Sequence, residues 1–283
     1  MVTDRETNQV YFSELLATDG RYRDAWRSIT AALDKHGVRY GLLKGTKDIW
    51  CRDYMPVQQS ADSFIQFRYE PSYLSAHPHL KTDPAHVLQV YGLRAQHSDI
   101  NLDGGNVLRW TDRVILTDRV FEENPALTKA RLHDQLENLF EAEVIIIPAI
   151  RSDMTGHADG LVRFYDRQTL ICNRMADEYQ YWQRGMRKVI SQYGFDYVEL
   201  PLFEYKEKQY PLSAIGCYVN YLEIGDLILV PVFDVPGNKD QEAIDTLAQV
   251  FSNRTIETVN INAVARQGGL LNCVTWNVLD DKV

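Results

Sequence analysis

The sequence predicts an α/β ring of five repeated modules around a pseudo-fivefold axis. Three observations support this fold class. Polar stretches recur along the chain at intervals of roughly fifty to sixty residues, a spacing typical of repeat and propeller architectures. A pattern of strand, turn, strand, helix and strand recurs between residues 106 and 260. The final run of the chain carries the strands that the first module lacks, so the ring can close.

The repeated pattern is clearest in three consecutive stretches. The first has strands over 106–110 and 113–117, a helix over 127–140 and a strand over 143–148. The next two follow the same order, with strands over 161–165 and 169–172, a helix within 178–194 and a strand over 196–200, then strands over 217–223 and 227–232, a helix over 239–251 and a strand over 255–260. A module of this kind cannot bury its own apolar face, so it must stack on its neighbours.

The ends of the chain complete the ring on this interpretation. An amphipathic helix over 23–35 and a strand over 38–43 lack leading strands, whereas the final run over 272–278 lacks a helix. We therefore expect the C-terminal strands to complete the first module and leave no exposed sheet edge. A strand is expected over 63–69, and the proline-containing segment 70–93 is predicted to be a long loop that could cover a site. Residues 1–283 are expected to form a single domain.

Composition narrows the classes of function. An apolar content of 45% and a net charge of −9, without a basic run, indicate a soluble globular protein and argue against a nucleic-acid partner. The apolar runs are too short to cross a membrane, and the charged start of the chain does not resemble a secretory signal. The four cysteines show no CxxC pair, so we expect no disulfide, no metal and a cytoplasmic location. An acidic protein favours a small cationic partner.

Five polar stretches follow the closing strands of the modules, and the ring would direct all of them to one central cavity. They are Trp50-Cys51-Arg52-Asp53, Asn101 to Asn106, Thr155 to Asp159, Tyr218-Val219-Asn220 and Gln267 to Trp276. Taken singly, each has an ordinary structural interpretation, such as a turn at Asp103, an ion pair at Asp53 or a buried thiol at Cys273. Their common spacing favours a functional role. Cys172 and Cys217, which lie within predicted strands, are assigned to the core.

Such a cavity would hold a thiol, an imidazole, three carboxylates and an amide. Cys273 and His157 would form a nucleophile with an acid/base partner. Carboxylates oppose the ionisation of a nearby thiol, so Asp53, Asp103 and Asp159 must serve another purpose. A guanidinium ion suits them, because its planar set of donors binds carboxylates bidentately, and its charge would favour the thiolate. Two carboxylates would also hold its central carbon against the sulfur.

These stretches resemble agmatine deiminase and the Porphyromonas-type peptidylarginine deiminases of the guanidine-modifying superfamily. The matching stretches occur in the family's order: Trp50 to Asp53, Asp103 to Asn106, Gly156 to Asp159 and Gly268 to Cys273. The resemblance implies a five-bladed α/β propeller of ββαβ modules, the pentein fold, which agrees with the repeat pattern. It also implies a catalytic domain without a cofactor.

The resemblance implies a role for each matching residue. Cys273 would attack the guanidinium carbon, and His157 would protonate the departing ammonia and then activate water. Asp53 and Asp159 would hold the guanidinium nitrogens. Asp103 stands where many relatives carry Glu, and it would orient His157 or contact the substrate. Two further residues would line the pocket, Trp50 and Asn220.

The expected function is hydrolysis of a guanidino compound to its ureido product and ammonia, with agmatine as the preferred substrate and N-carbamoylputrescine as its product. The alternatives are a peptidyl- or free-arginine deiminase, an amidinotransferase and a non-catalytic guanidinium-binding relative. The substrate's tail stays open, because a free arginine carboxylate could pair with one of four arginines near the motifs, Arg52, Arg109, Arg163 and Arg266. A homo-oligomer is compatible with the sequence.

Overall fold

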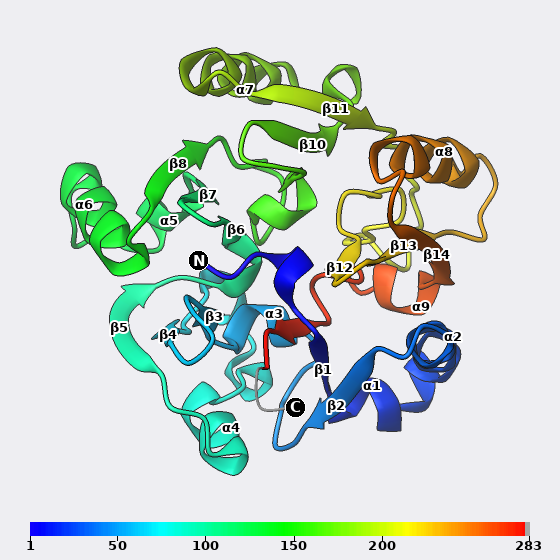
Figure 1. Ribbon diagram of the computed structural model, residues 1–283, viewed down its shortest axis with the longest axis horizontal. Helices are drawn as coiled ribbons and strands as arrows, with labels where there is room; N and C mark the ends of the chain where they lie inside the picture. The colour runs from blue at the N-terminus through cyan, green and yellow to red at the C-terminus, as the bar shows by residue number, and fades with distance from the viewer. Residues whose placement is uncertain (281–283) are drawn as a thin grey trace.

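Five three-stranded sheets stand around a central axis in the computed structural model, which describes residues 1–280 (Figure 1). All the sheets have the same connectivity, in which the first two strands pair antiparallel and the second and third pair parallel. In each module one helix joins the parallel strands and lies at the periphery of the ring (Figure 1). The predicted ring of five ββαβ modules is confirmed.

The first module comprises β15 (Trp276–Val278), β1 (Gln9–Ser13), α2 (Arg23–Lys35) and β2 (Arg39–Leu43), and the second comprises β3 (Val57–Gln58), β4 (Phe64–Arg68), α4 (Pro84–Tyr91) and β5 (Gln96–Asn101). The third comprises β6 (Leu108–Trp110), β7 (Arg113–Thr117), α6 (Lys129–Phe140) and β8 (Glu143–Ile147). The fourth comprises β9 (Val162–Phe164), β10 (Thr169–Asn173), α7 (Gln180–Tyr193) and β11 (Asp196–Leu200), and the fifth comprises β12 (Leu222–Ile224), β13 (Leu227–Val232), α8 (Asp240–Val250) and β14 (Thr255–Asn260).

Short helices and 3₁₀ turns fill the connections. The helices are α1 (Glu14–Thr18), α3 (Cys51–Tyr54), α5 (Arg119–Glu122) and α9 (Asn262–Ala265). The 3₁₀ turns are η1 (Asp4–Glu6), η2 (Gly20–Tyr22), η3 (Ser72–Leu74), η4 (Pro78–Leu80), η5 (Gly104–Asn106), η6 (Ala158–Gly160) and η7 (Met175–Asp177).

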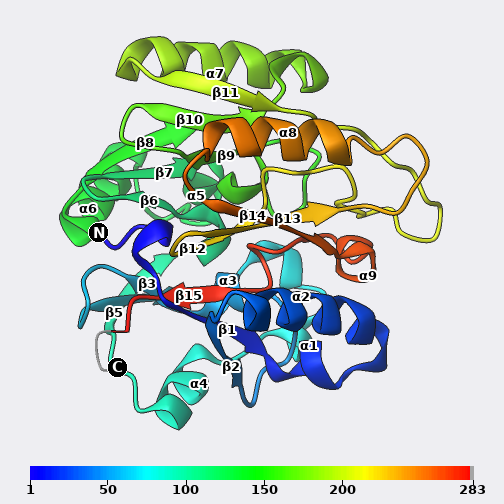
Figure 2. The same ribbon diagram turned by 45° about the vertical axis from the view of Figure 1, so that its right-hand side comes forward.

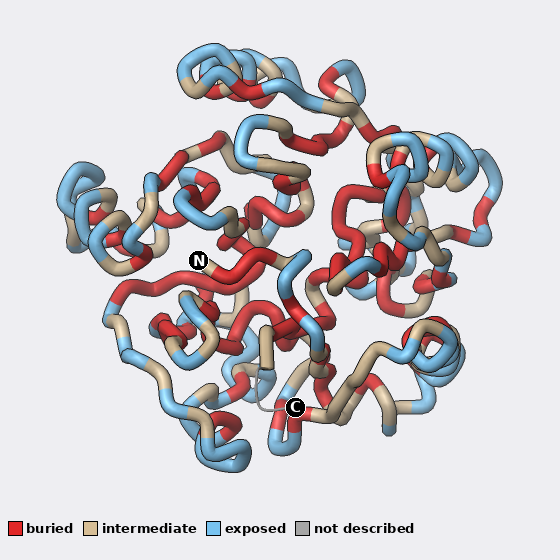
Figure 3. The backbone as a smooth tube through the Cα atoms, in the orientation of Figure 1, coloured by how far each residue is buried: buried red, intermediate tan, exposed pale blue. Residues whose placement is uncertain are grey.

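Helix α6 and strand β7 show how the sequence builds a module. In α6 the Thr128 side chain accepts the Arg131 amide at the N-terminus, and the buried residues Leu132, Leu136 and Phe140 recur every fourth position. Every residue of β7 is buried, as expected for a central strand paired on both sides. The buried backbone therefore gathers toward the middle of the ring, while the outer faces of the helices are exposed (Figure 3).

Segment 70–93 corrects one prediction, because it is not a continuous loop. Its end forms α4, which begins at an Asp83 cap that accepts the Ala85 amide and ends at the left-handed Gly92. Val87 and Leu88 are buried in a cluster with Leu43. Only these two helix residues are buried, which left too short an apolar period to recognise in the sequence. The second module therefore has the same ββαβ order as the others.

Ring closure corrects a second prediction. A single C-terminal strand, β15, pairs antiparallel with the N-terminal strand β1, with Tyr11 opposite Trp276. Figure 2 shows β15 in red beside β1 in blue. The sequence predicted that C-terminal strands alone would complete the module. Instead the two ends of the chain each contribute one strand. Strand β1 was missed because polar Gln9 and Ser13 border an apolar run of only three residues.

A strand was predicted over 217–223, but the observed strand β12 is shorter and covers only Leu222–Ile224. The preceding residues form turns, which place Asn220 beside the C-terminal loop. Across residues 1–280, none of the helices combines the length and the apolar character that a bilayer span requires.

Candidate active site

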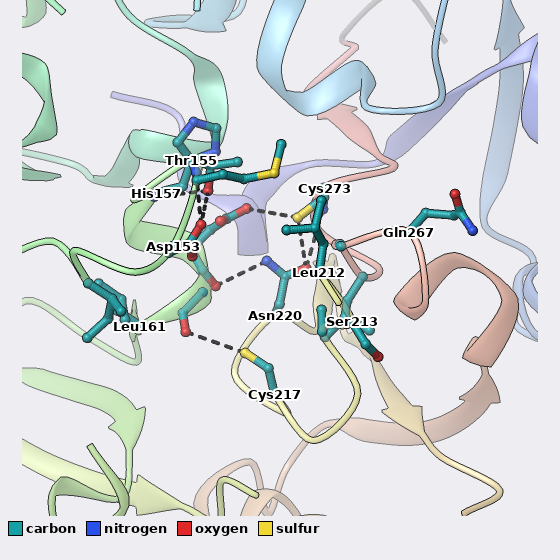
Figure 4. Close-up of a pocket in the computed structure, with 18 of the residues that line it drawn as sticks. Asp153, Thr155, His157, Leu161, Leu212, Ser213, Cys217, Asn220, Gln267 and Cys273 are labelled. Atoms are coloured by element: carbon teal, nitrogen blue, oxygen red, sulfur yellow. Dashed lines mark hydrogen bonds between the residues drawn. The ribbon is translucent and has the colours of Figure 1, made fainter. Parts of the chain in front are cut away.

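Four of the five polar stretches line one cavity of about 360 Å³, and the stretch from Asn101 to Asn106 does not. The cavity wall includes six of the seven residues singled out in the sequence, namely Trp50, Asp53, His157, Asp159, Asn220 and Cys273. The seventh, Asp103, is buried and touches the cavity only through His157. Figure 4 shows His157, Asn220 and Cys273 around this space.

His157 lies between two carboxylates. Its Nε2 donates to Asp103 Oδ2 at 2.9 Å, and its Nδ1 lies 3.5 Å from Asp53 Oδ1. The ring is buried, as are both partners. Asp103 begins the 3₁₀ turn η5, and His157 begins η6, so the tight turns of two adjacent modules bring the residues together. This geometry assigns Asp103 to the orientation of His157.

Asp53 is held by two groups besides the His157 ring. It lies in α3, where Gly105 N donates to its Oδ1 at 3.1 Å and Tyr73 OH donates to its Oδ2 at 3.3 Å. Gly105 approaches so closely that a Cβ atom there would lie 2.6 Å from both Asp53 Oδ1 and His157 Nδ1. The glycine pair after Asp103 therefore serves close packing of the site as well as turning the chain.

Cys273 lies in a turn that precedes β15. Its Sγ is 3.4 Å from Asn220 Oδ1 and 3.7 Å from Asp159 Oδ2. Asn220 Oδ1 also accepts the backbone amides of Asn272, at 3.0 Å, and Cys273, at 3.4 Å. The Asn272 side-chain amide donates to Asp159 Oδ2 at 2.7 Å. Asn220 thus holds the loop that carries Cys273, and Asn272 holds the carboxylate beside the thiol.

Trp50 forms part of the wall next to this loop. A Cβ atom at Gly269 would lie 2.4 Å from the Trp50 ring, so the ring and the glycine backbone are in direct contact. Gly268 has a φ of 104°, a conformation that side-chain-bearing residues rarely adopt. The Gly-Gly pair therefore lets the chain turn and packs the loop against Trp50.

The acidic surroundings set the protonation of the site. Burial raises the pKa of the Cys273 thiol well above its usual value, and Asp159 and Asp53 raise it further. Burial also raises the pKa of Asp53, to about 8, with Asp103 adding to the effect and His157 opposing it. Burial lowers the pKa of His157, but Asp53 and Asp103 outweigh that effect and raise it to about 10. These shifts favour a neutral Cys273 thiol and a protonated His157 imidazole at neutral pH.

Several cavity residues were not predicted from the sequence. They are Tyr73, Asn173, Glu178 and Cys217, while Asn272 supports the site through Asp159. Cys217 had been assigned to the core; it is only partly buried, and it lines the cavity because the expected strand does not form there. Cys172, the other cysteine assigned to the core, is fully buried. A single Tyr or Glu carries no motif that would have revealed it.

A possible metal-binding group lies elsewhere. Within residues 1–280, the side chains of His133, Asp134 and Glu137 are close enough together to hold an ion, but they belong to the outer helix α6. None of them lines the cavity. The cavity itself presents a thiol, an imidazole and carboxylates.

The fold is a five-module α/β propeller of the pentein type, and Cys, His and Asp side chains converge at its cavity. The chain belongs to the Porphyromonas-type peptidyl-arginine deiminase family, whose model matches residues 14–278. It is 24% identical over 211 residues to a protein of Mycoplasma mycoides subsp. mycoides named "Putative agmatine deiminase", a match that covers 62% of this chain and 55% of that protein. The chain thus matches about half the length of this curated relative.

Solved structures share the fold over nearly the whole chain. The agmatine deiminase of C. jejuni superposes with a TM-score of 0.79 at 18% identity, covering 98% of this chain and 95% of the other. An agmatine deiminase of Enterococcus faecalis superposes with a TM-score of 0.75 at 15% identity and the same coverage. At these identities the likeness establishes the fold.

Proposed function

We propose that the protein is a cofactor-independent deiminase that hydrolyses a guanidino compound, agmatine in preference to arginine, to the ureido product and ammonia. One observation carries this proposal. A thiol, a protonated imidazole and two carboxylates line a single cavity, with Cys273 Sγ 3.7 Å from Asp159 Oδ2 and His157 Nδ1 3.5 Å from Asp53 Oδ1. Guanidinium is the ligand that two carboxylates would hold with its carbon between a sulfur and an imidazole.

The chemistry follows from these positions. With its nitrogens on Asp53 and Asp159, the guanidinium offsets the two charges that raise the pKa of Cys273 and so favours the thiolate. The thiolate attacks the guanidinium carbon and forms a C–S bond. His157 gives a proton to the departing nitrogen, the C–N bond breaks, and ammonia leaves a thiouronium. His157 then removes a proton from water, which attacks the same carbon and expels the thiolate to give the ureido product.

The pairing of the arginines near the motifs bears on the tail of the substrate. Arg109 and Arg163 both bind Asp4, and Arg266 pairs with Glu207. Arg52 donates to Asn272 O and to Asn277 Oδ1. Among the described residues that line the cavity there is no Arg or Lys. A free arginine carboxylate would meet carboxylates rather than a cation, and this supports agmatine, as do the names of the relatives.

Mass spectrometry of the products tests the proposal. The protein and its Cys273→Ala variant are each mixed with agmatine, free arginine and an arginine-containing peptide. We expect that only the unmodified protein converts agmatine, and that the product has the small increase in mass that results when oxygen replaces an imino group. Ammonia should appear in equal amount. Turnover by the variant would refute the role of Cys273. Absence of product from all three compounds would refute the deiminase.

A further inference from the structure

We propose that Glu178 and Asn173 form a second subsite, which binds the ammonium group at the far end of the substrate. The inference rests on the proposed function, because it assumes that the guanidinium occupies the space between Asp53 and Asp159. It assigns a class of substrate, a guanidino compound with an unbranched chain that ends in a primary amine. It also assigns a specificity role to two residues that belong to none of the sequence motifs.

The first observation is an unpaired acceptor. Asn173 ends strand β10 and its side chain is buried, with 2% of the residue exposed. Its Nδ2 donates to Gly160 O at 2.9 Å and to Glu178 Oε1 at 3.0 Å. Because both partners are acceptors, the amide orientation is fixed, with its nitrogen toward them. The Asn173 Oδ1 atom is then buried and has no hydrogen-bond partner among residues 1–280. Buried acceptors in proteins are normally hydrogen-bonded, so this atom is expected to receive a donor from a ligand.

The second observation is an uncompensated carboxylate. Glu178 lines the same cavity as Cys273, and no Lys, Arg or His of the described chain pairs with it. Burial raises the pKa of Glu178, although Asn173 opposes the shift. An ammonium group bound here would supply the missing charge and would favour the carboxylate form.

The third observation is position. Cys217 Sγ donates to Gly160 O at 3.4 Å, and Figure 4 shows Cys217 on the far side of Asn220 from Cys273. Gly160, whose carbonyl Asn173 also contacts, and Glu178 therefore belong to a part of the wall distinct from the nucleophile loop. This part offers acceptors, including the exposed Asp153, and no basic side chain of the described residues lines it. A primary ammonium has three donors and no acceptor, so it matches such a wall.

Arginine differs from agmatine by a carboxylate beside the amine, and that group would face Glu178. Butylguanidine differs by lacking the amine, so it would leave Glu178 and Asn173 unsatisfied. A site that requires a polar partner discriminates strongly against an analogue without it. The subsite therefore predicts the order agmatine, butylguanidine, arginine.

The experiment compares kcat/KM for agmatine and butylguanidine in the unmodified protein and in Glu178→Gln. We expect agmatine to be preferred by about tenfold or more, and Glu178→Gln to remove that preference by raising KM for agmatine while butylguanidine changes by less than about twofold. Glu204→Gln, which alters an exposed carboxylate outside the cavity wall, is the matched control and should change neither value. Equal use of the two substrates, or an equal loss of both in Glu178→Gln, would overturn the proposal.

A second variant keeps the test informative if Glu178→Gln folds poorly. Glu178→Asp withdraws the carboxylate by one methylene, so the best substrate in a series of ω-aminoalkylguanidines of increasing chain length should become a longer one. An unchanged optimum would contradict the subsite. If no guanidine is turned over at all, the proposed function fails, but calorimetry with Cys273→Ala still separates the two ideas. Tighter binding of agmatine than of butylguanidine would support the subsite, and equal binding would refute it.

Discussion

His157 is the residue whose protonation depends most on its neighbours. Asp53 and Asp103 hold its pKa near 10, so it carries a proton across the neutral range. In the proposed reaction this proton goes to the departing ammonia, and activity should fall as pH rises through the pKa of His157. Asp103 supports the proton both by charge and by the 2.9 Å hydrogen bond to Nε2.

Asp103→Asn should therefore move the alkaline limb of the pH profile. Removing the carboxylate charge lowers the pKa of His157, so kcat/KM should begin to fall at a pH lower by about one unit or more. The profile of kcat/KM against pH measures this shift, and NMR titration of the His157 ring checks it in the absence of substrate. Asp112→Asn, on an exposed turn, is the control. An unshifted limb with reduced activity would mean that Asp103 acts only by packing.

Asp53 should release a proton when substrate binds. Burial raises its pKa to about 8, although the charge of His157 opposes the shift, so this carboxyl binds protons near neutral pH in the free protein. A bound guanidinium favours the Asp53 carboxylate, so the proton on Asp53 is released, whereas His157 stays protonated because its pKa lies near 10. Calorimetry of agmatine binding to Cys273→Ala, in buffers of different ionisation enthalpy, should show proton release at pH 7 and tighter binding as pH rises toward 8. Proton uptake on binding would contradict this assignment.

At the scale of elements, the short turn η5 (Gly104–Asn106) connects structure to catalysis. A Cβ atom at Gly104 would lie 2.1 Å from Arg52 O, which is backbone, whereas one at Gly105 would meet the side chains of Asp53 and His157. The two glycines are adjacent, yet substitution of each should have a different effect on the protein. The first supports the packing of α3, and the second leaves room for two cavity residues.

Gly105→Ala should reduce activity far more than stability. The added methyl group must displace Asp53 or His157, and small misplacements of reacting groups cost about a hundredfold in rate. Gly104→Ala should instead lower the melting temperature strongly, because backbone must move. Thermal unfolding and kcat/KM, measured for both variants beside Gly20→Ala as a tolerant control, distinguish the two effects. Equal behaviour of Gly104→Ala and Gly105→Ala would contradict the assignment.

Elements with strong local patterns could be predicted from the sequence, and the others could not. Strands β7 and β13 have the predicted bounds because apolar runs are bordered by turn residues, and α2 because its apolar period is complete. Helix α4 was missed because tertiary packing of Val87 and Leu88 stabilises it despite a short pattern.

The residues of the candidate site likewise divide into those with a recognisable sequence pattern, which could be predicted, and those without one. Four of the five motif stretches could be placed at one cavity because each follows a closing strand of a repeated module, and the ring fixes where such loops point. Tyr73 and Glu178 reach the cavity from turns with no motif, so only the folded chain brings them there. The contact of Asp103 with His157 depends on the packing of η5 against η6, which sequence spacing could not specify.

At the scale of the whole molecule, one carboxylate near the axis links several modules. The N-terminal segment crosses the middle of the ring (Figure 1), and Asp4 of this segment pairs with Arg109 of β6 at 2.7 Å and with Arg163 of β9 at 2.6 Å. It also accepts from Asn277 of β15. Both arginines are almost completely buried, so without Asp4 their charges would repel each other and that of Arg52 in a low-dielectric environment.

Asp4→Asn should therefore destabilise the ring, by about 3–5 kcal/mol at pH 7, because it leaves buried guanidinium groups without a counter-charge. Burial raises the pKa of Asp4, but Arg109, Arg163 and Arg52 outweigh this and lower it well below its ordinary value. A carboxylate with a lowered pKa stabilises the fold above its unfolded-state pKa, near 3.8, and loses that contribution as pH falls through the folded-state pKa. Urea unfolding of both proteins should consequently show a wide difference in the free energy of unfolding at pH 7, and the difference should narrow as the solution is acidified.

Asp24→Asn, on the exposed side of α2, is the control and should show almost no difference at either pH. A difference between Asp4→Asn and the unmodified protein that stayed constant with pH would mean that Asp4 acts through its hydrogen bonds rather than through its charge.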